Sequence, residues 1–162
     1  MGQQQLILLV LATVIVGVAI VVGIRAFTEN SVKSVADAMT QESVKIANDL
    51  QAWKKKPAPF GGQTGAAKSD PADFSGLASV KDLGYTEAGG VLKYETLNGC
   101  YEIIPEAGGA TIKGFNGGEN VATLVTVSGM TDTSIEQTAD YPKLGDAGTA
   151  DATSCAAPTT TP

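Results

Sequence analysis

The chain has 162 residues, a formal net charge of −6 and no histidine, and its length suits one domain with an appendage. Residues 1–56 carry +2, from six Lys or Arg against four Asp or Glu, and residues 57–162 carry −8, from five Lys against 13 Asp or Glu, so the acidic distal part argues against nucleic-acid binding. Without histidine, no Ser/His/Asp or Cys/His catalytic set is possible, and we expect neither an enzyme nor a cofactor site.

The first element is a run of 19 uncharged residues, Leu6 to Ile24. As a helix it would span about 28 Å, close to the roughly 30 Å of a bilayer core. Many of its residues are β-branched, but in lipid only a helix satisfies its own backbone. A cleaved secretory signal would need a basic start and a shorter apolar run, which residues 1–5 and this run do not provide. We therefore expect a retained transmembrane helix over residues 1–25.

Two features of the sequence predict opposite orientations of this helix in the membrane. Arg25 and Lys33 follow the apolar run, and by the positive-inside rule they would place the C-terminal side in the cytoplasm. The two cysteines and the Pro/Thr-rich end favour an exported head instead. We favour the exported head.

Residues 26–56 continue the helix with a different pattern. Apolar residues recur every seven positions on one face, and charged residues occupy the others. The helix should end before Pro57, which disfavours helical geometry in the residue that precedes it, and it should be weakest at residues 27–31. The residues expected to pack against the head are Val32, Met39, Ile46, Leu50 and Trp53.

The head is expected to be a small antiparallel sheet. Residues 57–90 are rich in Gly and Pro and predict a loop, with a possible short helix over 73–83. Residues 91–130 predict a meander of four strands, at 91–97, 100–104, 110–115 and 121–127, with a hairpin turn at Asn98-Gly99. Residues 131–162 look irregular. The fold class is thus α+β, with one long helix packed on a sheet.

Two sets of residues raise the question of a crosslink or a metal. Cys100 and Cys155 would form a disulfide worth about 4 kcal/mol if the head is exported, and two buried thiols are the alternative. Acidic side chains within residues 131–162 offer oxygen ligands for Ca²⁺. Their spacing matches no EF-hand, so side chains that are simply solvated are the simpler interpretation. These weak calcium candidates are Asp140, Asp146 and Asp151.

A charge-free N-terminal helix, an amphipathic continuation, a Gly-rich loop, an antiparallel sheet and a C-terminal Cys together resemble type IV pilins and the pseudopilins of type II secretion. Members of this family are cut after a Gly, and Gly2 is the candidate position here. A cut there places Ile7 where the family usually has Glu.

The resemblance implies a structural subunit of an extracellular filament, assembled by side-by-side packing of N-terminal helices. The implied partners are copies of the chain, a pilus assembly machine in the inner membrane, and the lipid bilayer before assembly. The alternative is a single-span, membrane-anchored extracytoplasmic binding module that forms no filament. The residues expected in the membrane and then in the filament core are Leu6, Leu9, Thr13, Gly17, Ile20 and Ile24.

Overall fold

A computed structural model describes residues 2–116 and 121–138 and divides the chain into two compact units, Met1–Ser34 and Val35–Pro162. Helix α1, Gly2–Lys55, supplies the described part of the first unit and the first element of the second. It ends two residues before Pro57, with Lys54 and Lys55 in its last turn, where cations interact favourably with the helix dipole.

The segment expected to be the weakest part of the helix stays helical. Thr28 donates its hydroxyl to the carbonyl oxygen of Ile24 at 3.0 Å, one helical turn earlier. This bond satisfies the side chain within the helix, so it does not compete for the backbone elsewhere.

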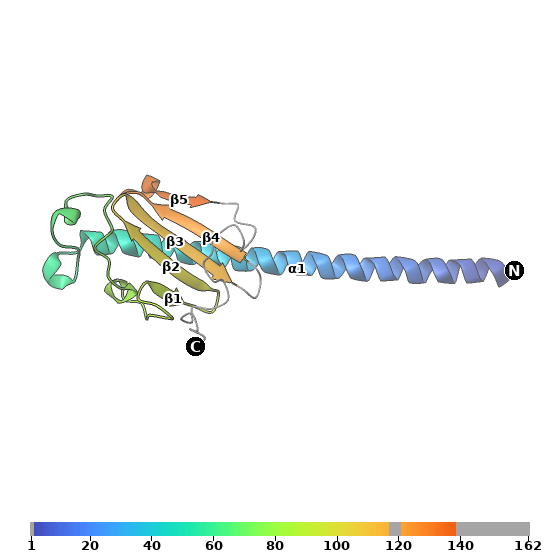
Figure 1. Cartoon of the computed structure of the whole chain (residues 1–162). Helices are drawn as coiled ribbons and strands as arrows, with labels where there is room; N and C mark the ends of the chain where they lie inside the picture. The colour runs from blue at the N-terminus through green and yellow to red at the C-terminus, as the bar shows by residue number, and fades with distance from the viewer. Residues whose placement is uncertain (1, 117–120, 139–162) are drawn as a thin grey trace, which may run out of the picture. The chain divides into compact units, whose positions relative to one another are not determined.

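The second unit contains a five-stranded antiparallel sheet in the order β1-β2-β3-β4-β5 (Figure 1). Neighbouring strands are consecutive in the sequence, so each connection is short. The predicted Asn98-Gly99 turn lies between the first two strands, and the amide of Thr96 donates to the carbonyl of Gly99 at 2.9 Å. The strands are β1 Lys93–Glu95, β2 Cys100–Glu106, β3 Gly109–Asn116, β4 Val121–Val127 and β5 Ile135–Thr138.

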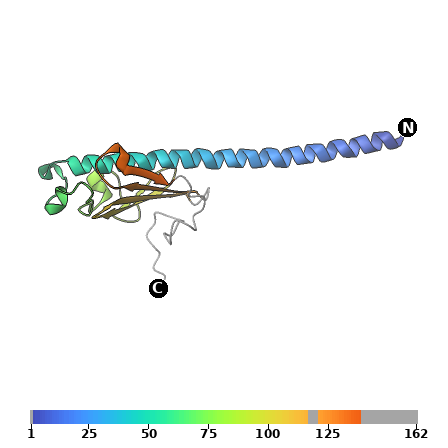
Figure 2. The same ribbon diagram turned by 90° about the horizontal axis from the view of Figure 1, so that it is seen from above.

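Within this unit the second half of α1 lies along one face of the sheet, as the edge-on view in Figure 2 shows. The predicted α+β fold, a long N-terminal helix packed on an antiparallel sheet in a pilin-like layout, is confirmed. Four of the predicted packing residues are buried, namely Met39, Ile46, Leu50 and Trp53. The fifth, Val32, belongs to the first unit and is half-buried.

Two expectations for the head were wrong in part. Residues 132–138 are not irregular, because β5 pairs with β4 and a 3-10 turn, η4 Asp132–Ser134, precedes it. Only Ile135 of β5 is apolar and packs on the core, so the strand depends on backbone pairing with β4. Its sequence therefore shows almost no hydrophobic pattern from which a strand could be predicted. The possible helix over 73–83 shrinks to the four-residue turn η3 Val80–Leu83, while the loop before it holds the 3-10 turns η1 Ala58–Phe60 and η2 Ala66–Lys68.

The inner face of the sheet is built from rows of side chains that cross β2, β3 and β4. One row joins Ile103, Ile112 and Val125, and all three are buried against the helix residues of the core. Burying a side chain of this size contributes about 1.5–3 kcal/mol. Buried residues alternate with partly buried ones along most of β2 and β3, and this alternation determines which face of the sheet meets α1.

A second row crosses the sheet with a glycine at its centre. Tyr101 and Thr123 flank Gly114, and the Thr123 hydroxyl lies 3.2 Å from the hydroxyl of Ser43 on α1. A Cβ atom at Gly114 would lie 2.5 Å from the Thr123 Oγ1 atom and 2.9 Å from the Tyr101 Cε1 atom. The glycine thus leaves room for the tyrosine ring and for this polar contact between sheet and helix.

Replacing Gly114 with Ala should lower the free energy of unfolding by about 1–3 kcal/mol, because the added methyl overpacks the row. Thermal unfolding of the full chain in detergent measures the change. Gly108→Ala is the matched control, since no atom lies within 4 Å of its Cβ position. Equal melting temperatures for the two variants would contradict this account of the row.

Candidate functional site

Within the first unit, residues 6–24 present a helix surface that is apolar on every side. The large apolar side chains from Leu6 to Ile24 each keep between 52 and 67 % of their surface exposed. Monomeric soluble proteins rarely expose contiguous apolar patches of this extent. We call residues 6–24 the apolar segment, and it is the candidate functional site.

The only hydroxyl in the apolar segment is satisfied inside the helix. Thr13 donates to the carbonyl oxygen of Val10 at 2.8 Å. Backbone groups in the middle of a helix are paired as well, so the segment offers a neighbour almost nothing but hydrocarbon. Helix α1 is long and apolar enough to cross a membrane.

The two glycines of the apolar segment lie open to the surroundings. No described atom lies within 4 Å of a Cβ position built on Gly17 or Gly23. Their size is therefore not required by any contact in the described part of the chain. Small residues of this kind permit a second helix to approach closely.

The predicted membrane and core residues are all found on this exposed surface. Leu6, Leu9, Thr13, Gly17, Ile20 and Ile24 lie on α1 and are exposed. Gly2 is the first described residue and is exposed too, and cleavage after it stays a prediction.

The predicted disulfide and calcium ligands fall largely outside the described residues. Cys100 begins β2 and is buried, whereas Cys155 lies outside residues 2–116 and 121–138, so their pairing stays a prediction. Asp140, Asp146 and Asp151 lie outside the described residues as well. Within those ranges, no three His, Cys, Asp or Glu side chains form a group suited to a metal ion.

A carboxylate at the helix–sheet contact is held by three donors that sequence reasoning missed. Glu42 of α1 accepts hydrogen bonds from the Thr96 hydroxyl at 2.8 Å, the Asn98 amide at 2.7 Å and the Tyr101 hydroxyl at 2.5 Å. Burial by itself raises the pKa of Glu42, but these hydrogen bonds outweigh it and the net pKa lies below the ordinary value. The contact fixes the β1–β2 hairpin on the helix.

Three tyrosines extend this contact across the head. The ring centroids of Tyr85 and Tyr94 lie 4.4 Å apart, and those of Tyr94 and Tyr101 lie 6.3 Å apart. The Tyr85 hydroxyl donates to Asp49 of α1, just as Tyr101 donates to Glu42. Burial, and then the neighbouring carboxylate, raises the pKa of both Tyr85 and Tyr101. Both hydroxyls therefore stay protonated and act as donors that brace the helix.

A buried ammonium group secures the loop that follows the helix. Lys54 is only 4 % exposed, and its Nζ atom donates to the Gln63 Oε1 atom at 2.7 Å, to the Ala67 carbonyl at 2.6 Å and to the Asp73 carbonyl. Removing a charge from water is costly unless such partners replace the water. The lysine thus gathers three points of the loop around the end of α1.

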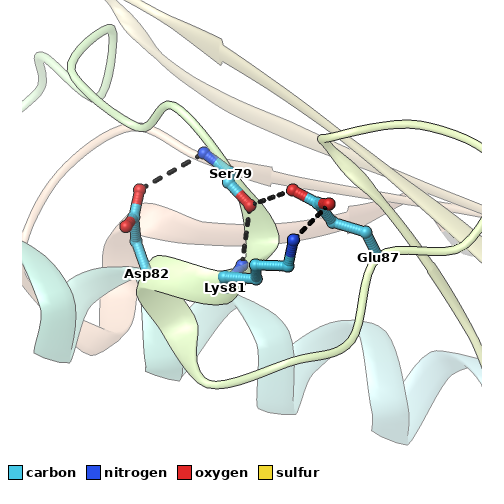
Figure 3. Close-up of polar contacts among 4 residues, drawn as sticks. All are labelled: Ser79, Lys81, Asp82 and Glu87. Carbon is cyan, nitrogen blue, oxygen red and sulfur yellow. Dashed lines mark hydrogen bonds and ion pairs between the residues drawn. The ribbon is translucent and has the colours of Figure 1, made fainter.

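A serine next to a carboxylate, seen in Figure 3, also serves the fold. The Ser79 hydroxyl donates to the Glu87 Oε1 atom at 2.5 Å and accepts from the Lys81 amide at 3.0 Å, while the Lys81 ammonium lies 2.6 Å from the Glu87 Oε2 atom. Asp82 accepts from the Ser79 amide at 3.2 Å and completes a capping box for η3. The contacts of these four polar side chains thus stabilise η3 and the chain next to it, which accounts for their presence without a catalytic role.

Comparison with known protein-family models, with curated proteins and with solved structures found no significant match.

The hydrogen bonds to Glu42 make the head sensitive to acid. A carboxylate whose pKa is lowered in the folded state stabilises it above the ordinary pKa of 4.5, and this stability is lost as the pH falls through the lowered value. At pH 7, Glu42→Gln should cost about 1–3 kcal/mol, and the difference from the native chain should shrink below pH 4.5. Unfolding by denaturant at several pH values measures this.

The matched control for Glu42 is Glu95→Gln, since Glu95 is an exposed carboxylate on β1. A Glu42→Gln variant that loses no more stability at pH 7 than this control would show that the three hydrogen bonds contribute nothing net.

Proposed function

We propose that this protein is a non-enzymatic structural subunit of an extracellular filament of the type IV pilus kind, in which the apolar segments of many copies pack side by side. The observation that carries the proposal is the apolar segment itself, exposed on every side of the helix. A membrane anchor or a filament core surrounds a helix completely, and only such surroundings cover all of this surface.

The gain from covering the apolar segment is large. It contains 14 Val, Leu and Ile side chains. At about 1.5–3 kcal/mol for each fully covered side chain, coverage is worth tens of kcal/mol relative to water. The isolated chain in water would therefore associate or precipitate, and the segment needs apolar surroundings throughout the life of the protein.

The segment is suited to exchange lipid for other helices. Lipid tails are as apolar as leucine side chains, so moving the helix from a bilayer into a bundle of like helices changes its hydrophobic free energy little. Packing between helices then replaces the contact with lipid, and Gly17 and Gly23 offer positions of close approach. The subunit would thus wait in the inner membrane with its head outside and be extracted into the filament by an assembly machine.

The head supports the proposal by being self-contained. Its helix, hairpin and loop are joined by the contacts of Glu42, Asp49 and Lys54. These contacts do not involve the apolar segment. Such a head keeps its structure while the segment changes surroundings, as a subunit that passes from membrane to filament requires.

The alternative function is a membrane-anchored binding module. The length of the apolar helix supports this module as well as it supports the filament subunit, because lipid alone would cover the segment. Shearing cells and imaging the supernatant separates the two. Sheared fibres that contain the chain support the filament, whereas a chain that stays entirely with the membrane fraction supports the anchor.

A charge at the middle of the apolar segment should abolish fibres. Val14 is 56 % exposed in the single chain and would be enclosed in a filament core. In Val14→Lys, each copy carries an unpaired charge into that core at a cost of several kcal/mol. Quantifying the chain in sheared and membrane fractions measures the loss.

Val14→Leu is the control, and the amount of Val14→Lys in the membrane fraction must match that of the native chain, so that failed insertion is distinguished from failed assembly. Normal fibres from Val14→Lys would refute the proposed core.

A further inference from the structure

Three charged residues of alternating sign follow the apolar segment directly. Arg25, Glu29 and Lys33 stand four residues apart and are all exposed on α1. Four residues advance a helix by about 6 Å and turn it by about 40° beyond one full turn. The three side chains therefore form one narrow row, which we call the charge row, along the surface of the first unit.

Among residues 2–116 and 121–138, the charge row has no ion-pair partner. Oppositely charged residues four apart on a helix often form ion pairs. In the described residues, however, the ion pairs are Lys81 with Glu87 and Lys93 with Glu102, and neither involves the charge row. No ion pair within the described part of the chain thus competes with a contact between these three charges and another molecule.

The alternation makes the charge row complementary to a copy of itself. If a parallel helix lies alongside and is displaced by one step of about 6 Å, Glu29 of one copy faces Arg25 or Lys33 of the other. A displacement of two steps sets Arg25 against Lys33, which repel each other. An anionic lipid surface fits the row less well, because Glu29 lies between the two cations.

We propose that Arg25, Glu29 and Lys33 set the axial register between neighbouring copies, by pairing with the charge row of a second copy displaced along the helix axis by one four-residue step. This inference rests on the proposed filament function. The apolar segment binds strongly but is nearly uniform along its length, so it discriminates poorly between registers. Charges contribute less affinity and more selectivity, because a wrong displacement brings like charges together.

The first test reverses the central charge. Glu29→Lys makes the row uniformly positive, so every displacement between parallel copies repels, and the yield of sheared fibre should fall about tenfold. Ser31→Lys is the matched control, because residue 31 is exposed and lies about 200° around the helix from residue 29, off the charge row. Ser31→Lys should keep the native fibre yield.

The second test inverts the whole row in the triple variant Arg25→Glu, Glu29→Lys, Lys33→Glu. The inverted row is again complementary to its own copy, so fibre formation should recover. When the native and the inverted chains are expressed together with different tags, like charges face each other at the native register. Each fibre should then carry one tag, whereas two differently tagged native chains should mix freely.

The outcomes separate the two proposals. If the native chain forms no fibres, the proposed function fails and the register contact fails with it. If the native chain forms fibres but Glu29→Lys forms them as well as Ser31→Lys does, or if native and inverted chains mix freely, only the register contact is overturned. Immunoblots of the membrane fraction must show equal amounts of every variant.

Discussion

The exposed hydrocarbon of residues 6–24 is the constraint on which the rest of this protein depends. A helix with one apolar stripe can be covered by one partner, but a helix that is apolar all round must be enclosed. Along α1 the pattern changes from apolar all round to apolar on one side, and the helix residues buried in the core of the head come from the one-sided part. The proposed membrane and filament states both enclose residues 6–24, the part of the helix that is apolar all round.

The head is organised so that its stability comes from its own contacts. Polar groups of α1 anchor three different parts of it, with Glu42 holding the β1–β2 hairpin, Lys54 the loop after the helix, and Gln51 the segment before β5 through its bond to the Gly129 carbonyl at 3.0 Å. These bonds add direction to the apolar packing, because a hydrogen bond requires a defined geometry. A subunit whose apolar segment moves from lipid into contact with protein benefits from a head that keeps its structure during the move.

Much of the fold could be predicted because its signals are local. The uninterrupted apolar run, the seven-residue spacing from Met39 to Trp53, the Pro57 boundary and the Asn98-Gly99 turn each act over a few residues. The missed features depend on residues distant in sequence. The Glu42–Tyr101 bond spans 59 positions and the Tyr85–Asp49 bond 36, and neither pair is marked by its own neighbours. The same holds for β5, because its single apolar residue does not predict a strand unless the pairing with β4 is already known. For the candidate site, the apolar segment was predictable. That the charge row forms no ion pair with any other described residue was not predictable, since the spacing of its residues equally suits pairing within the helix.

The most direct measurement of the central claim is the behaviour of the intact chain without detergent. The full chain is purified in detergent, the detergent is removed, and the product is followed by sedimentation velocity, with mass spectrometry to verify that residues 1–25 are present. If the apolar segment must be enclosed, the chain will sediment as large assemblies or precipitate. A soluble monomer with those residues intact would contradict the account.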